Sequence, residues 1–408
     1  MYDISPEWQP DPMTPGGPMI PRIEWDFAPY NRWTFQRVRE FVPSASIWRG
    51  GGTVLQLSER IADIDGIEFE VAGRHSTIRE FLDGSFTDAF LVLHHGHVIA
   101  ERYMNGLKPH YQHHAMSVSK SITATVCGIL VHKGLIDTGS PVTRYLPELE
   151  ATAYRGATVQ HLLDMTTGVT VTGPYTEPGT HAYMMQRASG LKPLENADDP
   201  RTMWQLILRL TEQQRPHGAV FDYRSTETNV LGFIMQRASG KLLAELISTE
   251  LWAPMGAEED AYMTVDHGGF AVASGCFNAT LRDYARFALL LLRGGALNGK
   301  QIIPSEWIEE TRSGNRDLSW GEPRSFSSST SSAPTILPAG GYHNQFWIED
   351  PNRRAYSCRG AFGQFIYIDP EADFAAVKLS AWPEAENSDR TIETLAAIHA
   401  IRGRFSRR

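Results

Sequence analysis

The chain has 408 residues, of which 42% are apolar, enough for two or three domains of about 150 residues each around hydrophobic cores. Its formal net charge of −9 is spread along the sequence rather than held in a tail, which argues against a nucleic-acid partner. No apolar run approaches the roughly 18 residues that a membrane span needs, so no membrane partner is expected.

The three cysteines predict a reducing environment. Cys127, Cys276 and Cys358 are odd in number, lie far apart and form no Cys-x-x-Cys pair, as expected of buried free thiols. The first nine residues carry Asp3 and Glu7 and lack the basic start and apolar stretch of a secretory signal. We therefore expect a cytoplasmic protein.

Hydrophobic periodicity predicts strands near both ends of the chain and helices between them. Ala89–Leu93 and Val98–Tyr103 flank a histidine-rich turn and predict a β-hairpin, and Met116–Lys133 predicts a helix. Apolar residues three and four apart predict further helices, and four apolar segments separated by turn residues predict an antiparallel meander. The helices are Thr158–Met165, Thr202–Glu212, Thr228–Ser239, Thr280–Gly294 and Asp389–Arg402; the meander strands are His343–Glu349, Ala355–Arg359, Gln364–Ile368 and Ala375–Ser380.

This order of elements predicts an α/β fold, in which an antiparallel sheet is flanked by helices and a helical subdomain is inserted. We expect residues 31–150 and 285–408 to form the α/β domain and residues 151–284 the helical subdomain. Residues 1–30 contain seven prolines, which disfavour both helix and central strand and predict an extended arm. The serine-rich stretch Ser325–Ser332 predicts a mobile loop.

The strongest chemical motif is Ser117-Val118-Ser119-Lys120 at the start of the Met116–Lys133 helix. Residues three apart share a helix face, so both side chains are expected to reach one cleft. The positive helix end and the Ser117 N–H can stabilise an oxyanion, and a partly neutral lysine can deprotonate the serine. Taken alone, the motif is matched equally well by a serine N-cap with a solvated lysine.

A second copy of the motif shows that the Ser-x-x-Lys spacing also occurs by chance. Ser189 and Lys192 are also three apart, but Gly190 and Pro193 forbid a continuing helix. The two side chains therefore have no common face. Only Ser117 and Lys120 have the geometry of a site.

Two later segments favour a site at Ser117. Tyr223-Arg224-Ser225 lies on a loop before a predicted helix, and a phenol held close to the Lys120 ammonium is expected to lose its proton more easily and to act as base and then acid. The same spacing occurs by chance in Tyr103-Met104-Asn105 and Tyr342-His343-Asn344. In Arg359–Gly363, at a junction between strands, two glycines allow the backbone to approach a substrate and offer N–H groups for an oxyanion hole.

In this order, Ser-x-x-Lys, Tyr-x-Ser and a glycine-flanked strand resemble the serine β-lactamase and penicillin-binding-protein superfamily, with its β-lactamase-like fold. The chain looks closer still to the nylon-oligomer (6-aminohexanoate-dimer) hydrolases, from about Trp25 to near its end. The blocks that carry this resemblance are Asn31–Trp33, Phe41–Ala45, Met116–Ser121, Val142–Leu149, Tyr223–Ser225 and Val377–Pro383.

The resemblance implies a role for each matching residue. Ser117 would be the nucleophile, with Lys120 and Tyr223 as proton-transfer partners and the Ser117 and Ala361 N–H groups as the oxyanion hole. The implied substrate-binding residues are Tyr175, Ser225, Ser274, Gly360 and Phe362. No metal and no cofactor is implied, the substrate would be a small amide or ester, and a homodimer is left open.

Departures from the family pattern leave the substrate open. No acidic residue after Tyr175 clearly matches the one that receives a substrate amino group, with Glu177 a weak substitute, and Phe362 replaces an expected histidine. A 6-aminohexanoate-oligomer hydrolase and a carboxylesterase therefore fit equally well. A β-lactamase or D-amino-acid peptidase is the alternative, although Gly360-Ala361-Phe362 in place of Lys-Thr-Gly predicts weak or absent β-lactamase activity.

Two other classes compete with a serine hydrolase. His94, His95, His97, His110, His113 and His114 raise the alternative of a metallohydrolase, but the first three lie in a predicted turn and the chain has no His-Glu-x-x-His motif. The second alternative is a non-catalytic binding protein on the same fold. Retention of Ser117, Lys120 and Tyr223 together argues against it.

Overall fold

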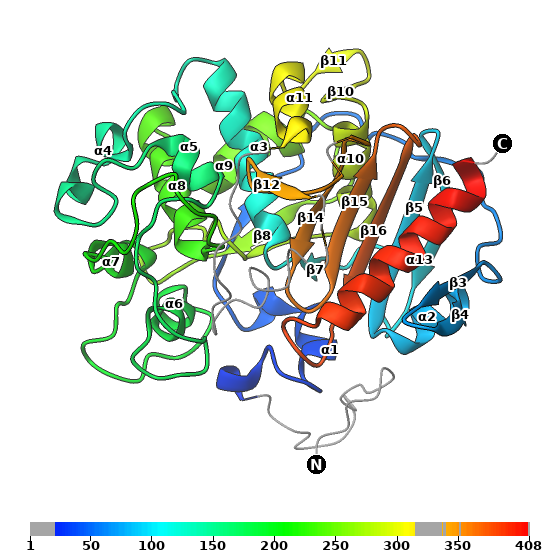
Figure 1. Cartoon of the computed structure of the whole chain (residues 1–408), viewed down its shortest axis with the longest axis horizontal. Coiled ribbons are helices and arrows are strands. Elements are labelled where there is room, and N and C mark those ends of the chain that lie inside the picture. The colour runs from blue at the N-terminus through cyan, green and yellow to red at the C-terminus, as the bar shows by residue number, and fades with distance from the viewer. Residues whose placement is uncertain (1–20, 315–336, 338–339, 351, 407–408) are drawn as a thin grey trace.

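The computed structural model describes residues 21–314, 337, 340–350 and 352–406. Its main sheet has eight strands in the order β12-β13-β14-β15-β16-β5-β6-β2 (Figure 1), and all neighbours are antiparallel except the pair of β2 and β6. The C-terminal meander thus pairs with the early hairpin through β16 and β5. The strands are β12 (Gly341–His343), β13 (Phe346–Asp350), β14 (Ala355–Gly360), β15 (Gln364–Asp369), β16 (Phe374–Ser380), β5 (Thr87–His94), β6 (His97–Tyr103) and β2 (Ser58–Glu59).

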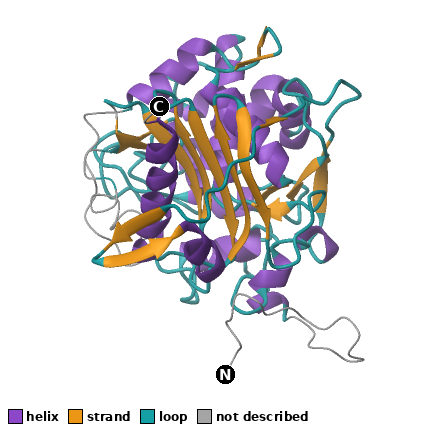
Figure 2. Cartoon of the chain, turned by 90° about the vertical axis from the view of Figure 1, so that its right-hand side faces the viewer, coloured by secondary structure: helices purple, strands orange, loops and turns teal. Residues whose placement is uncertain are grey.

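Both faces of this sheet are buried under helices (Figure 2), so its central strands are apolar on both sides rather than alternating. Phe90 and Val92 of β5 pack with α13 (Ser388–Ser406), which crosses one face. Leu91 and Leu93 belong to the larger core on the other face, with α3 (Val118–His132) and α10 (Leu281–Leu292). The molecule therefore has a helix–sheet–helix arrangement around two cores.

A second sheet of four short strands leads into α3. Its order is β1 (Ser44–Ile47), β8 (Ala261–Thr264), β9 (Phe277–Ala279) and β7 (His113–His114), all antiparallel. Because β7 ends three residues before Ser117, this sheet fixes the point at which α3 begins. Two hairpins complete the strands, β3 (Glu68–Val71) with β4 (Arg74–Thr77) and β10 (Ala296–Leu297) with β11 (Lys300–Gln301).

A cluster of helices lies beside the main sheet, on the left in Figure 1. Among them, α3 packs against α8, and α8 against α5 and α7. These helices and the remaining α-helices are α4 (Val142–Tyr145), α5 (Val159–Leu163), α6 (His181–Ala188), α7 (Met203–Leu208), α8 (Ser225–Ser239), α9 (Leu243–Ile247), α1 (Asn31–Thr34), α2 (Ile78–Gly84) and α11 (Ser305–Ser313). Short 3₁₀ helices lie at Arg22–Glu24, Val38–Glu40 and Pro147–Ala151, and a π-helical turn lies at Ser248–Trp252.

The predicted α/β fold, hairpin, main helices and meander are confirmed. One predicted strand is wrong in detail, because His343–Glu349 is the end of β12, a turn and most of β13; Asn344 and Gln345 have φ of 47° and 65°, which breaks the strand. Strands β8 and β9 fall inside the range predicted to be helical, and the three-part division stays a prediction. Residues 1–20 of the predicted arm and Ser325–Ser332 lie outside the described residues.

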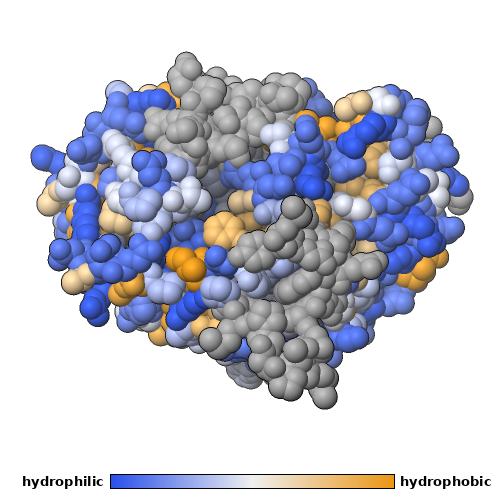
Figure 3. All heavy atoms as spheres, turned by 90° about the horizontal axis from the view of Figure 1, so that it is seen from below, coloured by the Kyte–Doolittle hydropathy of each residue, from blue (hydrophilic) through white to orange (hydrophobic). Residues whose placement is uncertain are grey.

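The described helices include none with the length and apolar character needed to cross a bilayer. Seen from below, the described surface is mostly hydrophilic, and hydrophobic residues reach it in small separate groups (Figure 3).

Candidate active site

Ser117 occupies the N-cap position of α3. The helix is held from behind by tight packing: a Cβ on Gly128 would lie 2.4 Å from the Trp307 ring, so only glycine fits there. Met116, directly before Ser117, has a φ of 49°, a strained conformation for a residue with a side chain. This bend delivers Ser117 to the helix start, half-buried and directed toward Lys120.

Lys120 lies one turn into α3 and is 1% exposed. Its Nζ donates to three oxygens: Ser117 Oγ at 2.9 Å, Ser225 Oγ at 3.1 Å and the Ser274 carbonyl at 2.6 Å. Burial lowers the pKa of Lys120 to about 7, because the charged form loses its hydration. A substantial fraction of neutral amine is therefore present near neutral pH, hydrogen-bonded to a serine hydroxyl.

Tyr223 approaches the same serine from the loop before α8. A hydrogen bond joins its phenol to the Ser117 hydroxyl, and the Lys120 Nζ lies 5.0 Å from the centre of the Tyr223 ring. Burial raises the pKa of Tyr223, with the Ser117 hydrogen bond opposing this. The expectation that the phenol loses its proton more easily is wrong, since desolvation outweighs the hydrogen bond from Ser117. Tyr223 is thus a neutral phenol that can relay a proton between oxygen atoms.

A buried ionic cluster fixes the loop that carries Tyr223. Arg224 Nη2 lies 2.5 Å from Asp222 and its Nη1 lies 3.6 Å from Glu227, and Thr167 donates to Glu227 at 2.5 Å. Burial raises the pKa of Glu227 to about 7, against the nearby guanidinium of Arg224. The residues on either side of Tyr223 are therefore held from within the core.

Ser225 and Ser274 serve the site in different ways. Ser225 is half-buried and presents its hydroxyl to Lys120, whereas the Ser274 side chain is 5% exposed and points at Asn229. Asn229 bonds both the hydroxyl and the N–H of Ser274, at 3.1 and 3.2 Å, which turns the Ser274 carbonyl toward Lys120. Asn229 was not predicted; its place one helical turn after Ser225 is the signal that would have found it.

The turn between β14 and β15 lies directly beside the residues that precede Ser117. A Cβ on Gly360 would lie 2.4 Å from the Ala115 carbonyl and 3.0 Å from the Met116 Cβ, so a side chain here would push the turn away. Gly360 and Ala361 are half-buried. Neither the Ala361 nor the Ser117 N–H has a backbone acceptor within the described residues. Two free N–H groups on adjoining segments can receive a developing oxyanion.

Comparison with known proteins decides the family. Residues 75–401 match the profile of the beta-lactamase family. The chain belongs to the beta-lactamase family. It is 34% identical over 365 residues to the 6-aminohexanoate-dimer hydrolase of Paenarthrobacter ureafaciens, covering 89% of this chain and 88% of that protein.

Solved structures agree with this beta-lactamase family assignment. A provisionally named 6-aminohexanoate-dimer hydrolase from Bacillus anthracis superposes with a TM-score of 0.84 at 29% identity, covering 97% of this chain and 98% of that one. A family VIII carboxylesterase has a TM-score of 0.55 at 18% identity, covering 79% and 94%, and shares the fold. The protein is a serine hydrolase of the beta-lactamase fold, in a family whose general mechanism passes through an acyl-enzyme.

Tyr175 and Phe362, two of the predicted substrate-binding residues, differ in whether the side chain reaches the site. Tyr175 is 39% exposed, and its hydroxyl is hydrogen-bonded to Ser225, which brings it to the site. Loss of water around the hydroxyl raises the pKa of Tyr175. The Phe362 ring is 6% exposed and packs edge-on against Phe35 at 5.2 Å, inside an aromatic cluster. Phe362 therefore contributes its backbone to the turn rather than its ring to the cleft.

An acidic residue near the site was missed by the sequence analysis. Glu386 lies on the exposed loop after β16, next to Ala385, whose carbonyl accepts the Phe362 N–H at 2.7 Å. Its negative charge raises the pKa values of Lys120, Tyr175 and Tyr223. Nothing in its local sequence marks it, because only the pairing of β16 with β5 and β15 brings this loop to the cleft.

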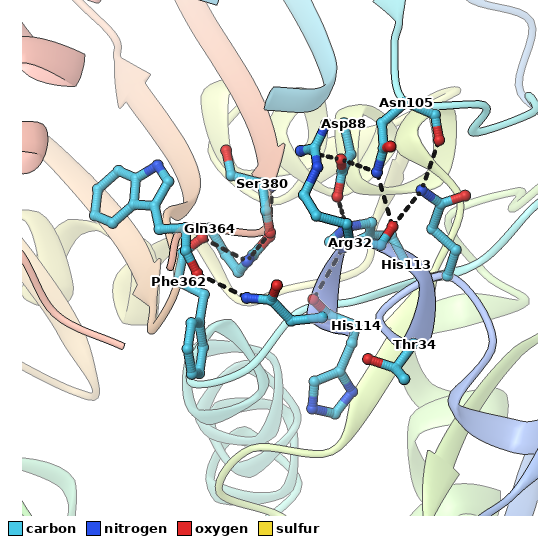
Figure 4. A network of polar contacts seen from close by, with 12 residues as sticks. Arg32, Thr34, Asp88, Asn105, His113, His114, Phe362, Gln364 and Ser380 are labelled. Atoms are coloured by element: carbon cyan, nitrogen blue, oxygen red, sulfur yellow. Dashed lines mark hydrogen bonds and ion pairs between the residues drawn. The ribbon is translucent and has the colours of Figure 1, made fainter. Parts of the chain in front are cut away.

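His113 and His114, two of the histidines raised as candidate metal ligands, have Asp88 and Asn278 as hydrogen-bond partners. His113 Nε2 lies 2.8 Å from Asp88, which also accepts from Arg32 at 2.8 Å and Asn105 at 2.9 Å (Figure 4). Burial lowers the pKa of His114 to about 3. Within the described part of the chain, no group of three or more His, Cys, Asp or Glu side chains is arranged to hold a metal ion. The second Ser-x-x-Lys is also structural, with Lys192 Nζ 3.0 Å from Asp26.

Proposed function

We propose that this protein hydrolyses a small amide or ester through an acyl-enzyme on Ser117. The observation that carries the proposal is the 2.9 Å hydrogen bond from Lys120 Nζ to Ser117 Oγ, made by an amine whose pKa is lowered to about 7. A neutral amine in that place can accept the serine proton as the oxygen attacks. The helix start and the half-buried serine supply the access and the polarity that the attack needs.

The reaction has two steps, acylation of Ser117 and hydrolysis of the acyl-enzyme. Ser117 Oγ forms a bond to the substrate carbonyl carbon while its proton passes to Lys120, and the carbonyl oxygen gains negative charge opposite the Ser117 and Ala361 N–H groups. The C–N or C–O bond then breaks, and Tyr223 gives the leaving group a proton that Lys120 restores. Water repeats the sequence in the second half, releasing the acid and returning the proton to Ser117.

We propose the 6-aminohexanoate-oligomer type as the first substrate class, on the strength of the 34% identity to a 6-aminohexanoate-dimer hydrolase over most of both chains. Carboxylic esters are the second class, supported by the buried position of the Phe362 ring, which gives the cleft no polar group where the family pattern has a histidine. Tyr175 and Ser225 would contact either substrate.

Covalent labelling tests the proposed nucleophile. A fluorophosphonate probe followed by mass spectrometry of the intact protein should add one adduct to the parent and none to Ser117→Ala. Ser189→Ala is the matched control, because Ser189 begins the other Ser-x-x-Lys motif yet donates to the Gln186 carbonyl at 2.9 Å; it should label like the parent. An unlabelled parent would favour a binding protein.

A panel of amides and esters then separates the substrate classes. The acyl-enzyme mass after rapid mixing identifies the transferred group, and turnover of 6-aminohexanoate oligomers or of short carboxylic esters ranks the two classes. Rapid turnover of nitrocefin would contradict the expectation that β-lactams are poor substrates.

We also propose a cytoplasmic location, supported by the burial of Cys127, Cys276 and Cys358 as free thiols. Cell fractionation with cytoplasmic and exported marker enzymes checks it. Homodimer formation stays a prediction, and sedimentation velocity at several protein concentrations would measure it.

A further inference from the structure

We propose that Gln364 is a positioning residue that orients the Ala361 N–H toward the oxyanion. The inference rests on the proposed function, because it assigns a support to the oxyanion hole of the same site. Gln364 is the first residue of β15 and is fully buried, directly after the turn that carries Ala361. Figure 4 shows its side chain beside Ser380 and Phe362, away from Asp88 and His113.

A single side-chain amide holds the back of this turn. Gln364 Nε2 lies 3.2 Å from the Ala361 carbonyl, 3.2 Å from the Phe362 carbonyl and 2.6 Å from the Ser380 carbonyl, and its Oε1 accepts the Ser380 N–H at 3.1 Å. Two amide hydrogens thus serve three carbonyls, so at least one hydrogen is shared. The turn is thereby tied to the end of β16.

The rest of the turn is held on the same side. The Phe362 N–H donates to the Ala385 carbonyl at 2.7 Å, and the Trp382 N–H donates to the Phe362 carbonyl at 3.2 Å. A Cβ on Gly363 would lie 2.3 Å from the Trp382 ring, so this backbone is pressed against the indole. The carbonyl of Ala361 and both backbone polar groups of Phe362 are therefore all hydrogen-bonded within the protein.

The Ala361 N–H is the backbone polar group of Ala361 and Phe362 that none of these hydrogen bonds uses. The peptide plane that carries it starts at Gly360, which is packed against Ala115 on the Ser117 side. Holding the next carbonyl through Gln364 limits rotation at Ala361, where a turn of the peptide would swing the N–H out of the cleft. A donor fixed before the reaction needs no reorganisation when the negative charge develops.

The chemistry of the anchor requires an amide. It must donate to several carbonyls and accept one N–H within a fully buried space, which among the common side chains is met by a neutral carboxamide. A carboxylate there would face three carbonyl oxygens, and an apolar side chain would remove the amide donor from all three.

The test compares a ground-state and a transition-state readout in Gln364→Met. A boronic acid adds to a nucleophilic serine and places a tetrahedral oxygen in the oxyanion hole. If Gln364 positions the Ala361 N–H, kcat should fall about 10- to 100-fold and boronate affinity by the same factor, with KM nearly unchanged. Boronate affinity equal to the parent's would overturn the proposal.

Gln36→Met is the matched control for loss of a buried amide. Gln36 is 6% exposed and its Nε2 donates to the Arg32 and Asn105 carbonyls at 3.3 and 3.2 Å, and neither acceptor belongs to the turn. It should lower thermal stability while kcat and boronate affinity stay at the parent's values. Equal losses of kcat in both variants would mean that general destabilisation is responsible and would overturn the proposal.

Two further measurements distinguish a failure of the positioning role from a failure of the proposed function. Gln364→Asn retains the amide but is one methylene shorter, so it replaces the methionine variant if that one does not fold and should show the same paired loss. Fluorophosphonate labelling of the parent at Ser117 is the test of the nucleophile itself. A parent that is labelled, combined with a Gln364 variant of unchanged boronate affinity, rejects the positioning role and leaves the proposed function intact.

Discussion

Two buried lysines give the most instructive comparison in the molecule. Lys120 in α3 and Lys378 in β16 are both almost completely buried, and burial lowers the pKa of each to about 7. Both amines also contact a serine hydroxyl, Ser117 in one case and Ser380 in the other. By lysine chemistry alone, either one would qualify as a catalytic base.

The surroundings separate them. Ser380 is fully buried, and Lys378 lies 5.5 Å from the ring centres of both Phe81 and Trp382, inside the molecule. Ser117 is half-buried, begins a helix and follows Ala115 and Met116, against which Gly360 of the β14–β15 turn packs. A lowered lysine pKa is therefore no sufficient sign of a catalytic site. Access for substrate and a place for the oxyanion make the difference.

Removing each amine in turn tests whether only Lys120 takes part in catalysis. Lys120→Met should lower kcat by about 10⁴-fold, because it removes the base with a pKa of about 7 that contacts Ser117 Oγ. Lys378→Met should leave kcat at the parent's value and change only stability. Steady-state kinetics on samples normalised by circular dichroism compares them, and a large loss of kcat in the Lys378 variant would contradict the distinction.

Tyr223→Phe should lower kcat by about 10²-fold, since it removes the phenol that bonds Ser117 and leaves the ring packing intact. Tyr103→Phe is the matched control, because Tyr103 begins a chance Tyr-x-Asn and its hydroxyl donates to Glu101 at 2.6 Å, outside the site. Single-turnover kinetics would show whether acylation or deacylation is slowed. Equal kcat in the two variants would remove Tyr223 from the mechanism.

Stability should depend on pH through Lys378. Its pKa is about 7 when folded and about 10.4 when unfolded, so between these values only the unfolded chain holds the proton. Stability therefore rises with pH in that window, by about 1.4 kcal/mol per pH unit for one lysine, and the contribution is constant below pH 7.

Urea unfolding at several pH values between about 7.5 and 9.5 measures this slope. The parent's free energy of unfolding should rise more steeply than that of Lys378→Met. Lys241→Met is the control for loss of a lysine on the surface, where Lys241 lies 3.8 Å from Glu245. Parallel curves for parent and Lys378→Met would show that Lys378 keeps its proton in the fold.

The smallest effect concerns Glu386. The active form has neutral Lys120, so activity should fall as pH drops through the pKa of about 7, and the negative charge of Glu386 raises that pKa. Glu386→Gln should move the acidic limb of kcat/KM to lower pH, by under about one unit because the carboxylate is exposed and screened. Glu384→Gln, in the same loop, should leave the limb in place. An unmoved or upward-shifted limb in Glu386→Gln would contradict the coupling.

The sequence predicted the parts of the site that depend on local spacing. Ser117 and Lys120 share a helix face because three residues make nearly one turn, and the glycines around Ala361 mark a close backbone approach. Tyr223 was found by its pattern, but its pKa direction was wrong, because burial by distant segments cannot be read from neighbouring residues.

Residues that reach the site through tertiary structure were missed or misplaced. Asn229 acts on Lys120 only through the Ser274 carbonyl, and Glu386 arrives at the cleft through the pairing of β16. The Phe362 ring turns into the aromatic cluster because its backbone takes a φ of 61° in the turn. Spacing fixes which side chains share an element, whereas these three depend on how elements pack.

The N-terminal segment supports the active site through the second sheet, because it holds the strand that precedes α3. Strand β7 is held by the Phe35 carbonyl, which accepts the His114 N–H at 2.8 Å, and by the Asp88 cluster that includes Arg32. The start of α3 follows directly. Proteolytic cleavage just after Gln36 is therefore expected to abolish activity by loosening β7 and the start of α3, although no residue that contacts the substrate is cut.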